Sequence, residues 1–477
     1  MLYRRSFKDR VLSTPVALLM LAALILSACQ LDQLLGQKDA NLDEGISAAE
    51  DNIGAPSVVM DVPVTLSGVV AITDATQAAS KVLGKTVSRA VTDPADCAKF
   101  FDPNDNAMID GYRMTRFLVG LSLSQSCFAD FIIQGVAAGA RVFDGKGLIE
   151  LPANPNDPGA PSHLQLAHSG FTYQLWMYFA ADRAALDTAK DKVIYITWTT
   201  STYETTGSMV MLRLEDPNDP NAPSNLRIDF KRSETKASNE IFLGFKQDHA
   251  GGMKGFRVEM LEDKSGVESI YSVRGNLEFA KQPNAASLPT DESFPPVRIT
   301  VNAIANASGA GVAIWSLKDL AFAIENTDFN LGSYVMSLSN RSYFEQTGVL
   351  SWIYRGISDG KYVNTSGTNS RTANTAAIID CLEGPASVDC NVGVVGMDLG
   401  AGYFVDPCAS TNGADCTKFM QGYYDQGAFN FLGDITNSAA ADEPIGDLKT
   451  QVDALVEFDS LFPEGETEET IFTAPVI

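Results

Sequence analysis

The feature that most constrains the fold is a long stretch, residues 171–302, in which apolar and polar residues alternate with a period of two. The clearest example is Leu226, Ile228 and Phe230, each flanked by polar residues. Such alternation is typical of antiparallel strands with one face buried and one face in water. Short links that contain Gly, Asn or Asp separate the segments, so we expect a meander of successive hairpins.

A helical segment is predicted before this stretch, because large apolar residues recur near helical spacing between Met108 and Val142. These residues are Ile109, Tyr112, Phe117, Leu121, Phe128, Ile132 and Val136. Core contact explains the stripe better than a cofactor site does. We therefore expect an α+β, mostly β fold: an antiparallel β meander, arranged as a sandwich or half-barrel, with this N-terminal helical segment packed on it.

The N-terminus has the three zones of an export signal. A basic start that contains Arg4, Arg5, Lys8 and Arg10 precedes an apolar run over 16–26 and small residues at 27–28. The apolar run is too short to cross a hydrocarbon core about 30 Å thick. No later stretch is expected to be apolar enough to cross a bilayer.

Leu26-Ser27-Ala28-Cys29 resembles the lipobox of bacterial lipoproteins, and the resemblance covers these four residues. It implies cleavage between Ala28 and Cys29, a diacylglycerol on the Cys29 sulfur, and a further acyl chain such as palmitate on the new amine. Gln30 stands where lipoproteins retained at the inner membrane carry Asp, which implies an outer-membrane location. The membrane would then be a partner through the N-terminal lipid.

Composition divides the rest of the chain into segments. They are a flexible acidic tether (29–57, after the signal peptide at 1–28), a strand plus helical segment (58–142), an antiparallel β domain (143–305), a Cys-containing mixed region (306–433) and an acidic, largely disordered tail (434–477). Within them, we expect a strand over 58–70, a helix over 313–324 and a short helix within 448–458.

Besides Cys29 the chain has six cysteines, and an even number in an exported protein suggests disulfides. Six cysteines allow fifteen pairings, among which we predict the nearest-neighbour set: Cys97–Cys127, Cys381–Cys390 and Cys408–Cys416. Zinc is disfavoured, because the sequence has no Cys-x-x-Cys pair and no His near a Cys. The formal net charge of −24 repels nucleic acid and anionic headgroups, so neither is expected as a partner.

A local repeat relates residues 155–164 (PNDPGAPSHL) to residues 217–226 (PNDPNAPSNL). The two copies are interpreted as equivalent turns before equivalent strands. A calcium site at Asp157 or Asp219 is the alternative. It is weaker, because Ca²⁺ takes six to eight oxygen ligands and each loop offers few carboxylates.

No catalytic constellation stands out, and no cofactor is expected. Residues 356–360 (GISDG) fit the nucleophile elbow around Ser358, but no helix pattern follows them and all three His residues precede them. The first functional hypothesis is therefore an envelope lipoprotein that binds an apolar or lipid ligand between sheet and helix, by analogy with half-barrel lipid carriers. The alternatives are a cell-surface or scaffold protein that binds another envelope protein or a glycan, and a carboxylate-dependent hydrolase.

Overall fold

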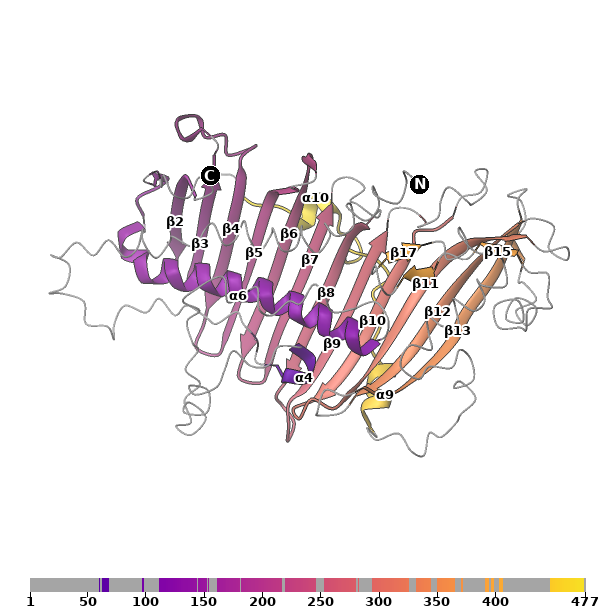
Figure 1. Ribbon diagram of the computed structural model, residues 1–477. Coiled ribbons are helices and arrows are strands. Elements are labelled where there is room, and N and C mark those ends of the chain that lie inside the picture. The colour runs from indigo at the N-terminus through magenta and orange to yellow at the C-terminus, as the bar shows by residue number, and fades with distance from the viewer. Residues whose placement is uncertain are drawn as a thin grey trace.

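The computed structural model describes residues 62–67, 111–143, 294–325 and 447–475, most of 145–282 and 332–371, and shorter pieces that include Met60, Cys97 and three strands between 391 and 405. In this part of the chain, β1 to β14 form one open sheet in which each strand lies antiparallel to the strand before it (Figure 1). The predicted class, a mostly β antiparallel meander with a helix packed on it, is confirmed.

The strands of the sheet are β1 (Ile149–Glu150), β2 (His163–Ser169), β3 (Thr172–Phe179), β4 (Lys192–Thr200), β5 (Glu204–Asp216), β6 (Asp219–Ser233), β7 (Lys236–Phe245), β8 (Met253–Asp263), β9 (Ile270–Phe279), β10 (Arg298–Asn306), β11 (Gly311–Glu325), β12 (Gly332–Phe344), β13 (Leu350–Asn364) and β14 (Ser370–Arg371). β15 (Asn391–Gly393) pairs with β11 outside this order. β16 (Gly396–Asp398) and β17 (Tyr403–Val405) form a separate pair.

A long helix, α6 (Gly111–Phe143), crosses the strands on one face of the sheet, as the apolar stripe predicts (Figure 1). At its start, the Gly111 amide donates to Ser342 of β12 at 3.1 Å. Farther along, Ser126 accepts a hydrogen bond from Asn239 of β7 at 2.6 Å. Between Gly111 and Ser126 the helix rises about 22 Å, close to the roughly 24 Å covered by the five strand spacings from β12 to β7. The helix therefore passes slightly more than one strand per turn.

The sheet face beneath α6 carries a continuous apolar row from β2 to β11. Its directly paired members are Leu166, Leu175, Ile196, Met209, Ile228, Ile241, Val258, Gly275, Val301 and Trp315. The apolar side chains of this row are all buried. Gly275 leaves a gap that Leu118 of α6 fills, since a Cβ at 275 would lie 2.3 Å from Leu118 Cδ1. Helix and sheet thus share one core.

Polar residues fix the position of α6 above this core. Asn239 donates to Ser126 of α6 at 2.6 Å and accepts from Arg232 of β6 at 2.7 Å. Burial lowers the pKa of Arg232 to about 10, while the charges of Asp130 and Glu262 act to raise it. Arg232 therefore remains a cation at neutral pH. A buried polar network of this kind specifies one docking position, because a shifted helix would leave its members without partners.

The opposite face is crossed by residues 447–475, which we call the strap, and we call this face of the sheet the strap face. The strap contains α9 (Asp447–Asp453), which lies against β10 and β11, and α10 (Glu468–Ile471). Near its end, the Pro475 carbonyl accepts a hydrogen bond from Trp176 of β3 at 3.0 Å. The strap therefore runs from the β11 side toward β3. The expectation of a largely disordered tail is wrong for this segment, whose short helix at 447–453 overlaps the one predicted.

The expected helix over 313–324 is also wrong, because these residues belong to β11. Period-two alternation is hidden in this strand because both of its faces are covered. Ala313 and Trp315 pack under α6, whereas Val312 packs against the strap. β10 and β11 also pair across the boundary suggested at 305/306, so the sheet is continuous there.

The strand expected over 58–70 is replaced by a helical turn, α4 (Val64–Ser67), within the part of this segment that the structure describes. Pro63 precedes the turn and its carbonyl accepts a hydrogen bond from the Leu66 amide at 2.9 Å. Proline is well suited to the start of a helix, because its φ is already helical. The turn packs against α6.

One described helix segment, Gly111–Ile133, is long and apolar enough to cross a membrane by length and composition. The expectation that no such stretch follows the signal is therefore wrong on these criteria. Within the molecule, 89% of the apolar window is buried. Its apolar side chains are accounted for by the core shared with the sheet.

The contact between Leu118 and Gly275 predicts energetic coupling across the helix–sheet interface. We expect Leu118→Ala to lower the free energy of unfolding by about 2–5 kcal/mol, and Gly275→Ala by about 1–3 kcal/mol, because the new methyl meets Leu118. In the double variant the methyl has room, so the two losses should be non-additive by about 0.5–3 kcal/mol. Urea unfolding measures all three. Additive losses would contradict the proposed coupling between Leu118 and Gly275. Val267→Ala, at a fully exposed position, is the control.

Candidate functional site: the strap face

Apolar residues of the strap occupy defined positions on the strap face. α9 packs its buried side chains against β10, β11 and β12. Farther along, two directly paired glycines, Gly244 of β7 and Gly255 of β8, make room for larger strap side chains. A Cβ at Gly244 would lie 2.7 Å from Phe472, and one at Gly255 would lie 3.2 Å from Leu461. The glycine pair thus forms a shallow depression that the strap fills.

Side chains of the sheet also bind the main chain of the strap. The donors and the carbonyls that accept from them are Trp176 and Pro475 (3.0 Å), Arg227 and Ile471 (3.1 Å), Asn276 and Phe458 (3.3 Å), Arg274 and Val456 (3.2 Å), Asn302 and Leu455 (2.8 Å), and Arg298 and Asp459. These donors come from β3, β6, β9 and β10. Because they contact carbonyl oxygens, they recognise the path of the strap backbone more than its side chains.

Carboxylates on the same face hold three arginines in position. The pairs are Arg227 with Asp229 (2.9 Å), Arg257 with Glu240 (2.7 Å), and Arg274 with Glu259. The three carboxylates are direct neighbours in the registers of β6, β7 and β8. Each guanidinium thus contacts a sheet carboxylate and the strap at once. Such pairing lowers the entropy cost of binding, because the arginine fork is already oriented.

Phe458 is the strap residue most closely held by these arginines. The guanidinium carbons of Arg257 and Arg274 lie 3.9 and 4.3 Å from the centroid of its ring. Both distances are within the range of cation–π attraction. The Phe458 side chain is 6% exposed, whereas Val456, two residues earlier, is 72% exposed. Between them, Glu457 forms an ion pair with Lys318 of β11.

The electrostatics of the carboxylates follow from their burial. Burial raises the pKa of Asp229, and the charge of Arg227 opposes this shift. Burial likewise raises the pKa of Glu240, where Arg257 opposes the shift and the charges of Glu259 and Asp229 add to it. A carboxyl with a raised pKa has one property of a general acid. In this structure, however, the oxygens of these carboxylates accept hydrogen bonds from arginines, so their observed role is to orient them.

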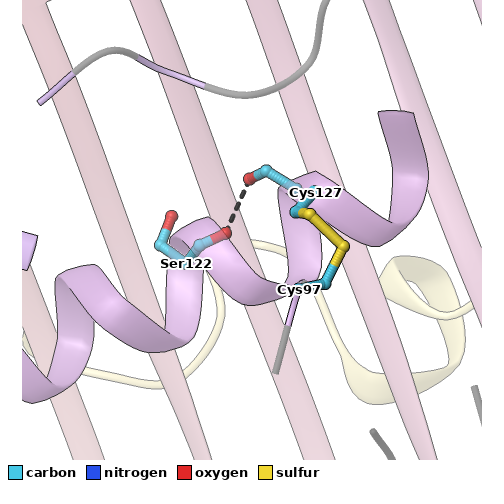
Figure 2. Close-up of a disulfide and its surroundings, with 4 residues drawn as sticks. Cys97, Ser122 and Cys127 are labelled. Carbon is cyan, nitrogen blue, oxygen red and sulfur yellow. Dashed lines mark hydrogen bonds between the residues drawn. A yellow bond between two sulfur atoms is a disulfide. The ribbon is translucent and has the colours of Figure 1, made fainter. Parts of the chain in front are cut away.

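Of the predicted disulfides, the structure contains Cys97–Cys127, which joins a preceding segment to the middle of α6 (Figure 2). Both cysteines are buried. A cross-link between residues 30 positions apart restricts the unfolded chain, by about 3–4 kcal/mol in the chain-entropy treatment. The cysteines of the other two predicted pairs, Cys381, Cys390, Cys408 and Cys416, lie outside the described residues, as do Ala28 and Cys29.

The structure brings no metal site together among the residues it describes, where no group of three or more His, Cys, Asp or Glu is arranged to hold an ion. Asp157 lies outside the described residues. Asp219 begins β6, where its backbone pairs with Asp216. The ends of the two repeat copies do occupy similar places, because Ser162 and Ser224 are both buried and precede equivalent buried leucines of β2 and β6. Ser358 lies within β13, at a register irregularity.

Sequence reasoning missed the strap and the arginines beneath it. A usable signal was present: Arg227 and Asp229 on β6, and Arg257 and Glu259 on β8, each place a cation and a carboxylate two residues apart on one face. Ion pairs between strands could not be predicted from this local pattern, since Arg257 of β8 binds Glu240 of the neighbouring strand β7. No family model, curated protein or solved structure matches this chain.

The position of Phe458 between two guanidiniums predicts that one ring holds much of the strap in place. We expect Phe458→Ala to weaken strap docking by about 3–5 kcal/mol and to speed amide hydrogen exchange across residues 447–475. Val456→Ala is the matched control, because it removes an exposed side chain two residues away. Exchange that is equally slow in both variants would show that the ring does not hold the strap.

Proposed function

We propose that the mature protein begins at Cys29, is anchored by lipid to the outer membrane, and acts as an envelope scaffold that binds an extended acidic segment of another envelope protein. The observation that carries the binding part is the row of side-chain donors aimed at strap carbonyls. Recognition through main-chain groups suits an extended polypeptide of variable sequence. In this proposal the strap is the resident occupant of the binding surface.

The chemistry of the strap indicates the partner that would suit this face. The strap is acidic, with Lys449 as its single basic residue. Ion pairs of its carboxylates with the sheet include Asp453 with Arg341 and Glu457 with Lys318. A partner segment would therefore combine carboxylates with aromatic or aliphatic residues that fit the arginine pair and the glycine depression. A basic partner is disfavoured by the same sheet cations.

The apolar-ligand function suggested first by the sequence remains a weaker proposal. It requires space between α6 and the sheet, where Leu118 fills the gap above Gly275 and Asn239 hydrogen-bonds directly to Ser126. The hydrolase alternative requires carboxylates free to act on a substrate, whereas Glu240 and Glu259 are paired with arginines. Both observations favour the scaffold.

The lipid anchor is tested by Cys29→Ala. We expect the wild-type protein to fractionate with membranes and its N-terminal peptide to carry fatty acid in mass spectrometry. The variant should lose the lipid and shift toward the soluble envelope fraction, because several acyl chains supply most of the membrane affinity. Membrane retention that is unchanged in the variant would contradict lipidation at this residue.

Binding in trans is tested with a labelled peptide of residues 447–475 and a chain ending at residue 446, whose sheet content is first verified by circular dichroism. We expect this chain to bind the peptide more tightly than the full chain does, because the full chain already holds its strap. Arg274→Met in the receptor should weaken binding by at least about ten-fold.

Two controls make the peptide result specific. Lys190→Met removes a cation whose side chain is 83% exposed and lies outside the strap contacts, so peptide binding should not change. A peptide of the same composition in scrambled order tests whether charge alone is responsible. Equal binding of the two peptides, or none by a folded receptor, would refute the proposed recognition.

A further inference from the structure

The meander topology gathers alternate turns at one end of the sheet, which we call the hairpin edge. It comprises the turns that follow β2, β4, β6, β8 and β10. Three of these turns carry large apolar side chains that are strongly exposed: Phe171 (75%), Tyr203 (75%) and Val267 (109%). The side chains stand at the tips of hairpins whose strands contribute buried residues to the core, so their exposure belongs to this edge of the sheet and does not arise from a poorly packed core.

The two aromatic tips are neighbours and continue into stacked rings on the α6 face. The Thr200 amide, at the end of β4, donates to the Phe171 carbonyl at 3.2 Å, which places the β2–β3 tip beside the turn that contains Tyr203. Just inside this end, Tyr173 stacks on His168 at 5.6 Å and on Trp198 at 5.1 Å. Amphipathic aromatic rings are enriched where proteins meet the membrane–water interface.

The first described helical turn, α4, is fixed at the same end. Thr65 of α4 donates to the carbonyl of Gly309, in the turn between β10 and β11, at 2.9 Å. Tyr112 of α6 donates to the Thr65 carbonyl at 3.2 Å. Figure 1 shows α4 at the lower ends of the strands. A lipid on Cys29 would therefore be tethered to the body at the hairpin edge.

We propose that the hairpin edge rests on the phospholipid bilayer, with Phe171, Tyr203 and Val267 entering the headgroup layer. This inference rests on one part of the proposed function, the lipid anchor at Cys29 that brings the folded body to the membrane. The turn between the aromatic tips and Val267 carries both Glu234 and Lys236, and the chain is acidic overall. This charge pattern fits a zwitterionic surface such as phosphatidylethanolamine and phosphatidylcholine, and the contact should depend little on salt.

The test places a tryptophan reporter at a tip of the full lipidated chain in vesicles of these two lipids, with and without brominated acyl chains. We expect Phe171→Trp and Tyr203→Trp each to add emission that brominated lipid quenches. Val456→Trp, at an exposed position on the strap face, should add emission that is not quenched. The proposal would be overturned if brominated lipid did not quench tryptophan at 171 and 203, or if it quenched tryptophan at 456 to the same extent.

A second measurement separates this inference from the anchor. The chain from residue 29 with Cys29→Ala carries no lipid, so its sedimentation with the same vesicles reports the tips alone. We expect the combined variant Phe171→Ser, Tyr203→Ser and Val267→Ser to reduce the bound fraction at least three-fold, while Val456→Ser leaves it unchanged. Binding that all of these chains share equally would overturn the edge contact even if Cys29 proves lipidated. A failure of lipidation alone would leave this measurement valid.

Discussion

A single open sheet has two faces, and a layer with apolar residues on both is stable only when each face is covered. In this chain one cover is α6 and the other is the strap. The two covers start near β10–β12 and run toward the low-numbered strands, one on each side. The architecture is thus three layers deep although only one layer is a sheet. The 33-residue helix is about 50 Å long, and it contacts strands from β2 to β12.

The two covers are held on the sheet by different kinds of interaction. Beneath α6 the row of paired side chains is apolar, and Leu118 meets it by close packing at Gly275. Beneath the strap, hydrogen bonds and guanidinium contacts add to two apolar clusters, and carboxylates such as Glu240 orient the arginines. Close packing tolerates little exchange of one segment for another, because cavities and overlaps are costly. Contacts to carbonyl oxygens tolerate sequence change, which is why we place the proposed partner on the strap face.

The sequence predicts the sheet and helix well where one periodicity dominates. Alternation such as Leu226, Ile228 and Phe230 identifies strands, and the apolar stripe over 108–142 identifies α6. Prediction fails where both faces of a strand are covered, as at 313–324, since apolar residues then occupy both faces and the period-two alternation is lost. Prediction also fails for the strap, because an acidic composition indicates disorder unless the arginines that bind the segment are known. These arginines are positioned only when the register of the strands brings Arg257 beside Glu240. The alternation of residues within one strand does not encode this register.

The order in which the elements occur along the chain has a consequence for biogenesis. Each strand pairs with its neighbour in sequence, so the hairpins can form progressively, whereas the bond between Trp176 and Pro475 joins residues 299 positions apart. Because α6 precedes the strands, it is available as a template from the beginning. The strap is synthesised after all the strands of the sheet. Until the strap has been made, the face that it covers is bare, and exposed apolar surface of this kind favours association between unfinished chains.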